Sequence, residues 1–128
     1  MKLLLDTHIL LWSAGQPEKL SAEATSLLLD SSNSLYFSAA SIWEIVIKRG
    51  LGRDDFKVNP VRLIKQLVIN GYEEVSVSSD HTLAVDTLPV LHKDPFDRIL
   101  IAQARTEGML LMTADEQVSR YGDGIVMV

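Results

Sequence analysis

The chain has 128 residues, a net charge of −5 and no cysteine. This length fits one domain spanning residues 1–128, and the lack of cysteine excludes disulfides, thiol nucleophiles and zinc–thiolate sites, which fits a cytoplasmic protein. No run approaches the roughly 18–20 apolar residues that a membrane span needs, and Asp6 ends the first apolar run too early for a leader peptide. The negative net charge argues at first against nucleic-acid binding.

Short apolar runs alternate with helical segments along the chain. The runs are too short to give a helical face, so each is expected to be a buried strand. In chain order, the expected strands are residues 2–5, 35–37, 74–77, 109–112 and 125–128. Caps and stop signals between them predict helices over residues 22–31, 39–49, 60–70, 79–87 and 95–107, with a short helix or turn after Asp6, an irregular stretch over 51–58 and a short helix after Thr113. This alternation predicts an α/β domain with a mainly parallel sheet of four to five strands covered on both faces.

Local signals at three helices set detailed expectations. Ser38 or Ser41 can cap the helix over 39–49. Thr113 and Glu116 are three residues apart, which is the spacing of a capping box. The helix over 60–70 is expected to have one apolar face, formed by Val61, Ile64, Leu67 and Val68. Leu63 and Ile69 are expected to lie off this face. Together with the 47% hydrophobic content, the face suggests a surface covered by a second copy or another protein, although a plain core role is nearly as good an explanation.

The segment 92–98 has the clearest local signal. Asp94 is a good N-cap, Pro95 suits the first helical position, and Asp97 falls three residues after the cap, where an acid favours the positive end of the helix dipole. Gly108 is the expected stop of this helix. Capping alone therefore explains both aspartates, and only their position relative to other acids points to chemistry.

Four acids from distant segments are expected at one edge of the sheet. Asp6 directly follows a strand, Asp115 follows another after two residues, and Asp97 begins the helix that feeds that strand. Glu44 lies in the early part of the helix over 39–49, about a turn from the same edge. Each acid alone could cap a helix, and Glu44 could pair with Lys48. The carboxyl edge of a parallel sheet is nevertheless where ligands bind, and like charges placed there repel.

A cluster of carboxylates without cysteine suits a hard cation, so Mg²⁺ or Mn²⁺ is the expected occupant. Magnesium is usually completed by water and substrate phosphate, which points to metal-dependent phosphodiester chemistry. The three histidines show no paired spacing, so we assign none of them to metal binding or general base catalysis.

Four blocks of the sequence together resemble a PIN-domain ribonuclease of the VapC toxin type. They cover nearly the whole chain in order: Leu3-Leu4-Leu5-Asp6-Thr7-His8, Ser41-Ile42-Trp43-Glu44-Ile45 with Lys48, His92-Lys93-Asp94-Pro95-Phe96-Asp97-Arg98 with Ile101-Ala102-Gln103-Ala104, and Thr113-Ala114-Asp115. The resemblance implies a three-layer α/β/α fold and a Mg²⁺- or Mn²⁺-dependent endoribonuclease that acts on single-stranded or looped RNA. It also implies a cognate antitoxin and a homodimer.

The resemblance also assigns roles to residues. Asp6, Glu44, Asp97 and Asp115 would be the catalytic and metal-binding acids, with Asp6 and Asp97 holding the metal directly; Thr7 and Thr113 would be supporting hydroxyls. Without the four acids the rest of the chain is close to neutral, so RNA need not meet a repelling surface. Cations in the motif segments could position phosphates, and we expect this role for Lys48, Lys93 and Arg98.

Two other functions remain open from the sequence. The chain could be a PIN-like module that binds RNA or protein without cutting, although its intact set of acids speaks against that. It could also be a phosphohydrolase with a nucleophilic aspartate. Asp6-Thr7-His8 lacks the second acid two residues on that many such phosphatases use, and no lysine follows the last strand.

Overall fold

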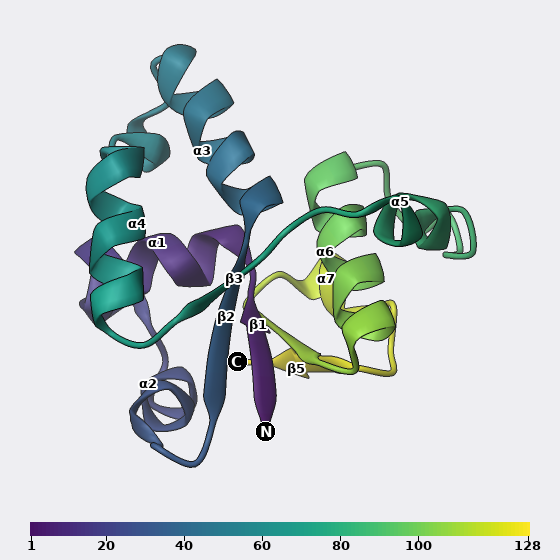
Figure 1. Cartoon of the computed structure of the whole chain (residues 1–128), viewed down its shortest axis with the longest axis horizontal. Coiled ribbons are helices and arrows are strands. Elements are labelled where there is room, and N and C mark those ends of the chain that lie inside the picture. The colour runs from purple at the N-terminus through teal and green to yellow at the C-terminus, as the bar shows by residue number, and fades with distance from the viewer.

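Five parallel strands form one sheet in the order β3-β2-β1-β4-β5, and the computed structural model describes all residues 1–128. All five predicted strands are present, with boundaries shifted by at most two residues: β1 Lys2–Leu5, β2 Ser34–Ser38, β3 Glu73–Val75, β4 Leu110–Thr113 and β5 Ile125–Met127. The register pairs Leu4 of β1 with Tyr36 of β2 and Leu111 of β4. The strand nearest the start of the chain therefore lies at the centre of the sheet (Figure 1).

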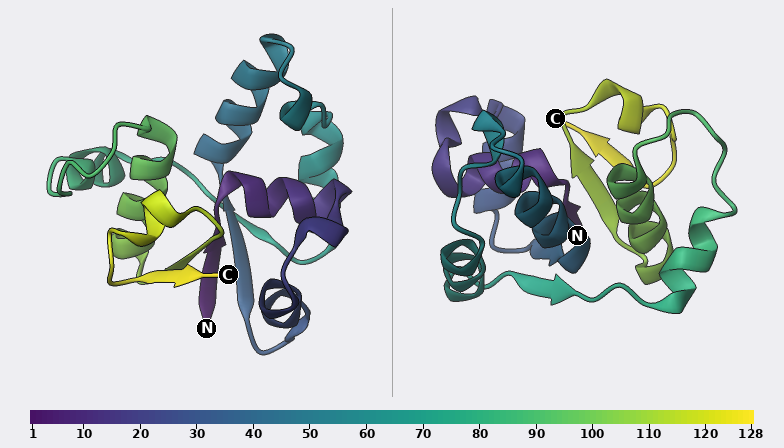
Figure 2. Two further views of the ribbon diagram at one scale, coloured as in Figure 1. Left: turned by 180° about the vertical axis from the view of Figure 1, so that it is seen from behind. Right: turned by 90° about the horizontal axis from the view of Figure 1, so that it is seen from above.

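Helices cover both faces of this sheet and give three layers. Figures 1 and 2 show the first four helices on one side and the last three on the other. The helices are α1 Thr7–Gly15, α2 Ala22–Leu29, α3 Ala39–Gly50, α4 Pro60–Ile69, α5 Ser79–Val85, α6 Pro95–Glu107 and α7 Glu116–Ser119, with 3₁₀ turns η1 Pro17–Lys19 and η2 Asp54–Phe56. The three-layer α/β/α architecture is thus confirmed. No helix is both long enough and apolar enough to span a bilayer.

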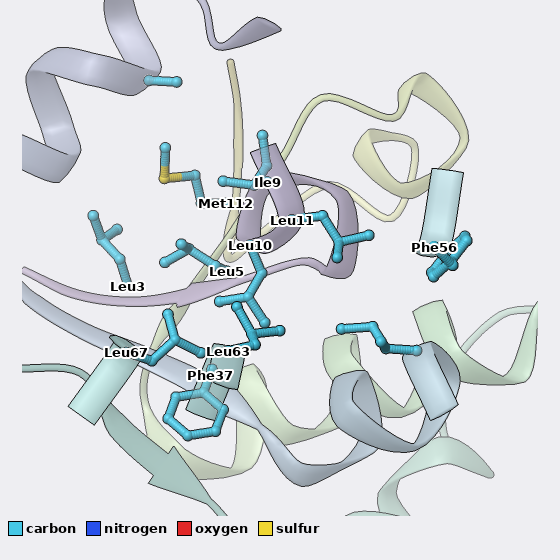
Figure 3. Packing of buried hydrophobic residues seen from close by; sticks show 12 residues of the cluster. Leu3, Leu5, Ile9, Leu10, Leu11, Phe37, Phe56, Leu63, Leu67 and Met112 are labelled. Atoms are coloured by element: carbon cyan, nitrogen blue, oxygen red, sulfur yellow. The ribbon is translucent and has the colours of Figure 1, made fainter. Parts of the chain in front are cut away.

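The alternation of side chains along β1 divides the core in two. Leu3 and Leu5 belong to the cluster formed with α1, α3 and α4, whereas Leu4 points to the opposite face and packs with residues of α6 and β4. Figure 3 shows the first cluster, to which Leu3 and Leu5 belong together with Leu10 and Phe37. All three leucines are fully buried. A strand covered on both faces needs apolar residues at every position, which explains the continuous Leu3–Leu5 run.

Helix α6 begins and ends as predicted. The Asp94 carboxylate accepts hydrogen bonds from the backbone N–H groups of Phe96 and Asp97 at 2.9 and 3.1 Å. Gly108 ends the helix with φ 68°, a left-handed conformation that glycine adopts without a steric penalty. Because α6 leads through this turn into β4, its first turn lies at the carboxyl edge of the sheet, beside the end of β1.

Four local predictions need correction or completion, and the first two concern α7 and α4. The N-cap of α7 is Asp115, not Thr113, because the Thr113 hydroxyl is engaged with Asp6 instead. The predicted apolar face of α4 is right only in part: Leu67 is buried and Ile64 packs against the core, but Val61 and Val68 are exposed. Leu63, predicted to lie off this face, is buried.

The two remaining outcomes concern the start of α3 and the loop after it. Ser38, rather than Ser41, caps α3. The stretch 51–58, predicted to be irregular, contains the turn η2, which inserts the fully buried Phe56 into the first core cluster.

Candidate metal and nucleic-acid site

Asp6 is placed at the carboxyl end of the central strand. It caps α1, and its Oδ1 accepts a hydrogen bond from the backbone N–H of Ile9 at 3.1 Å. Its Oδ2 accepts a hydrogen bond from the Thr113 hydroxyl. Burial raises the pKa of Asp6 above its usual value, and the nearby charge of Asp115 raises it further, while the hydrogen bonds from Thr113 and Ile9 act in the opposite direction.

Thr113 connects two of the acids. Besides donating to Asp6, its hydroxyl accepts a hydrogen bond from the backbone N–H of Asp115 at 3.0 Å. Asp115 is exposed and caps α7, with Oδ1 accepting from the Gln117 N–H at 2.8 Å. Because β4 pairs directly with β1, this hydroxyl bridges the ends of two neighbouring strands.

Asp97 lies opposite these groups in the first turn of α6. Burial raises its pKa from 3.8 to about 6, and the negative charges of Asp94, Asp6 and Asp115 raise it as well. A hydrogen bond of 3.0 Å between its Oδ2 and Nε2 of His92 partly offsets this rise. The structure thus brings Asp6, Asp97 and Asp115 close enough for their charges to interact.

Glu44 differs from the other three acids. It is buried on α3, and its carboxylate accepts a hydrogen bond from the Lys48 ammonium one turn later. This is the pairing with Lys48 that the sequence allowed as an alternative to a role in the acidic cluster. Lys48 lies 4.9 Å from the ring centroid of Phe56 and 5.8 Å from that of Phe96. Glu44 is not among the charges that raise the pKa of Asp6 or Asp97.

The four carboxylates do not converge on one point, and no three acidic or histidine side chains lie close enough together to hold one ion. Each carboxylate instead accepts hydrogen bonds from protein groups. Mg²⁺ needs only one or two direct carboxylates because it keeps several waters. Asp6 and Asp97, whose pKa values are raised by burial and neighbouring charge, therefore fit such a cation, which would favour their ionised forms.

The other predicted site residues have different surroundings. Lys93 is exposed and forms no ion pair, whereas the Arg98 guanidinium donates hydrogen bonds to the carbonyls of Pro89 and Val85 at 2.8 and 3.4 Å. Thr7 contacts none of the acids: its hydroxyl donates to Ser41 at 3.0 Å, joining α1 to α3. Arg98 thus holds the segment before α6, while Lys93 is free to meet a phosphate.

Sequence reasoning missed His92. Its ring contacts Asp97 through Nε2 and the Tyr121 hydroxyl through Nδ1, the latter at 2.8 Å. The only signal in the sequence was its place in the block His92–Arg98, since Tyr121 follows 29 residues later without any recognisable spacing.

An apolar groove of about 610 Å³ lies between α3, α5 and the start of α6. Trp43, on its α3 side, is 63% exposed and meets the Phe96 ring edge-on at 5.5 Å between centroids. Lys93 is one of the residues that line this groove. Trp43 therefore lines this groove.

The family model that describes the PIN domain matches residues 3–124. The chain belongs to the PIN-domain family. This PIN domain is similar in structure to VapBC2 from Rickettsia felis bound to a promoter DNA fragment (TM-score 0.70, 15% identity, covering 100% of this chain and 98% of that one). It is also similar to VapBC from Salmonella typhimurium bound to DNA (0.68, 13%, 100% and 97%) and to VapBC-1 from nontypeable Haemophilus influenzae (0.65, 20%, 100% and 97%).

At these identities the likeness establishes the fold. No curated protein matches this chain in sequence. The match of the family model confirms the predicted PIN family, and the acids of this PIN domain occupy the sheet edge described above.

Proposed function

We propose that this PIN domain is a VapC-type toxin, an endoribonuclease that depends on Mg²⁺ or Mn²⁺ and is neutralised by a cognate antitoxin. The observation that carries the proposal is the placement of Asp6, Asp97 and Asp115 at one sheet edge, where their charges interact. The structural neighbours titled VapBC support the toxin type. We propose single-stranded or looped RNA as the substrate, because attack on a phosphodiester needs a strand that can reach this edge.

The residues that would hold the metal are Asp6 and Asp97 directly, with Asp115 and Glu44 acting directly or through water. A bound Mg²⁺ or Mn²⁺ supplies polarisation of a phosphoryl oxygen and a lower pKa for an attacking water. The protein's own groups would position the metal-binding carboxylates. Thr113 and the Ile9 N–H fix the Asp6 carboxylate, while Asp115 adds negative charge that favours a cation.

The three basic side chains would have different roles in binding the substrate. Lys93 is exposed beside the groove and is placed to contact RNA phosphate without reading sequence. Lys48 neutralises Glu44, so it would contact phosphate only after Glu44 turns to the metal side. Arg98 would act indirectly, by holding the segment that carries Lys93.

Two protein partners belong to the proposal, namely an antitoxin and a second copy of the chain. Large apolar side chains remain exposed on the elements around the groove, and such surface supports coverage by protein. They are Trp43, Val46, Val77, Leu83, Val90 and Leu91. Light scattering on the purified chain distinguishes a 14.2 kDa monomer from a dimer of twice that mass.

The test of the activity is cleavage of a mixed, structured RNA pool by the purified protein with Mg²⁺, Mn²⁺ or EDTA. Asp97→Asn is prepared beside it, together with Asp123→Asn, which removes the same charge from an exposed turn. We expect metal-dependent cutting by the wild type and by Asp123→Asn only. Equal cutting by Asp97→Asn would identify a contaminating nuclease. Metal binding without cutting of any RNA would favour a PIN-like module that binds without cleaving.

A further inference from the structure

Four side chains form a continuous hydrogen-bonded chain that ends on Asp97. Nη1 of Arg98 lies 2.9 Å from the Tyr121 hydroxyl, which lies 2.8 Å from Nδ1 of His92. Nε2 of the same ring lies 3.0 Å from Oδ2 of Asp97. The His92 side chain is 9% exposed and that of Asp97 is 20% exposed, so water competes little for these bonds.

The direction of every bond in this chain follows from the donors. A guanidinium can only donate, so the Tyr121 oxygen accepts from Arg98. The ionised Asp97 carboxylate can only accept, so Nε2 of the neutral His92 ring donates to it, and the unprotonated Nδ1 accepts from the Tyr121 hydroxyl. In the neutral ring the proton is therefore on Nε2, and it is donated to Asp97.

We propose that His92 is a positioning residue that presents the Asp97 carboxylate to the cation. Its Nε2–H holds Oδ2 in one orientation and leaves Oδ1, which accepts no hydrogen bond from the protein, free to bind the metal. This inference rests on the proposed function, because it assigns a role toward the same cation. Tyr121 in turn favours this tautomer of His92, because its hydroxyl donates to Nδ1.

A purely structural role explains these contacts less well. Arg98 already anchors the segment before α6 through two backbone carbonyls, and Asp94 already caps the helix. The ring of His92 packs edge-on against Tyr121 at 5.3 Å, a contact that any aromatic side chain would keep. The hydrogen bonds to Tyr121 and Asp97 are the features that need a polar ring, and the second of them acts on a predicted metal ligand.

Three variants separate the hydrogen bonds from the packing. His92→Phe keeps an aromatic ring and removes both bonds. His92→Gln keeps an N–H that can donate to Asp97 and an oxygen that can accept from Tyr121. Tyr121→Phe leaves His92 intact and removes the hydroxyl that bonds both His92 and Arg98, so it tests the chain even if His92→Phe does not fold.

The first measurement is the affinity of the RNA-free protein for Mn²⁺, followed by electron paramagnetic resonance. We expect His92→Phe to weaken Mn²⁺ binding about 10- to 100-fold, the usual effect of losing an outer-shell partner. We expect His92→Gln to recover most of that loss and Tyr121→Phe to show a smaller loss. Wild-type affinity in His92→Phe would overturn the positioning role alone. No Mn²⁺ binding by the wild type would overturn the proposed function and this role with it.

The second measurement needs no metal. Nitrogen-15 NMR of the imidazole distinguishes a protonated from an unprotonated ring nitrogen. We expect His92 in the metal-free protein to carry its proton on Nε2 when neutral, and Tyr121→Phe to weaken this preference for Nε2 because it removes the donor to Nδ1. A proton on Nδ1 in the wild type would refute the hydrogen-bond directions and the proposed role.

Discussion

Replacing Asp97 by asparagine should stabilise the metal-free protein at pH 8. The pKa of Asp97 rises from 3.8 to about 6 in the folded state, mainly through burial and then through neighbouring acids. At about 1.4 kcal/mol per pKa unit, the charged form costs the fold about 3 kcal/mol. The side chain keeps 20% of its exposure, so solvent screening lowers the expected gain to about 2 kcal/mol. Asparagine can still accept the hydrogen bond from His92.

The sign of the pH dependence follows from proton linkage. Because the folded state binds its proton more tightly than the unfolded chain, the free energy of unfolding of the wild type falls as pH rises from about 4 to about 6. The advantage of Asp97→Asn should therefore be full at pH 8, shrink below pH 6 and vanish near pH 4.

Thermal unfolding followed by circular dichroism measures this effect. A gain of about 2 kcal/mol corresponds to about 6 °C in Tm for a chain of this size. Asp123→Asn, which removes an exposed charge, should stay within about 0.5 kcal/mol of the wild type. Mg²⁺ at about ten times its Kd should raise the stability of the wild type by about 1.4 kcal/mol and that of Asp97→Asn by less. An Asp97→Asn protein no more stable than the wild type at pH 8 would refute the reasoning that burial and the neighbouring acids make the charged form of Asp97 costly to the fold.

Three further perturbations test the same edge. Thr113→Val removes the hydroxyl that donates to buried Asp6 and should cost about 1–3 kcal/mol in urea unfolding, whereas Thr113→Ser should cost much less; equal losses would point to packing rather than to the hydrogen bond. Lys48→Met should cost about 2 kcal/mol because it leaves Glu44 buried without its cation, and adding Glu44→Gln should recover most of that loss; additive losses would argue against the pair. The rise in Tm caused by Mg²⁺ should diminish below pH 6, where protons compete for Asp97, and a rise that is constant from pH 8 to pH 5 would exclude Asp97 as a ligand.

The sequence contained enough to predict the fold. Apolar runs too short for helices marked β1, β2, β4 and β5, and the Asp94–Pro95 cap with Gly108 fixed both ends of α6. These signals are local, so they are readable one segment at a time. The placement of Asp6 and Asp115 at one edge required only the additional rule that parallel strands end on the same side.

What could not be predicted depends on tertiary contacts. The hydrophobic spacing of α4 favoured Val61 and Val68, but the direction in which the helix docks on α1 and α3 selects Leu63 and Leu67. Thr113 has the sequence spacing of a helix cap, but in the folded protein its hydroxyl donates to the Asp6 carboxylate at the end of the neighbouring strand.

The bond from Thr113 to Asp6 joins residues 107 positions apart. Contacts of such long sequence separation form late and slowly, because a long loop must close before they contribute. During synthesis β1 is made first, but it can pair with β4 only after nearly the whole chain has been made. A chain that ends before β4 therefore lacks the bond between Thr113 and Asp6 and the strand pairing that sets Asp6 beside Asp115.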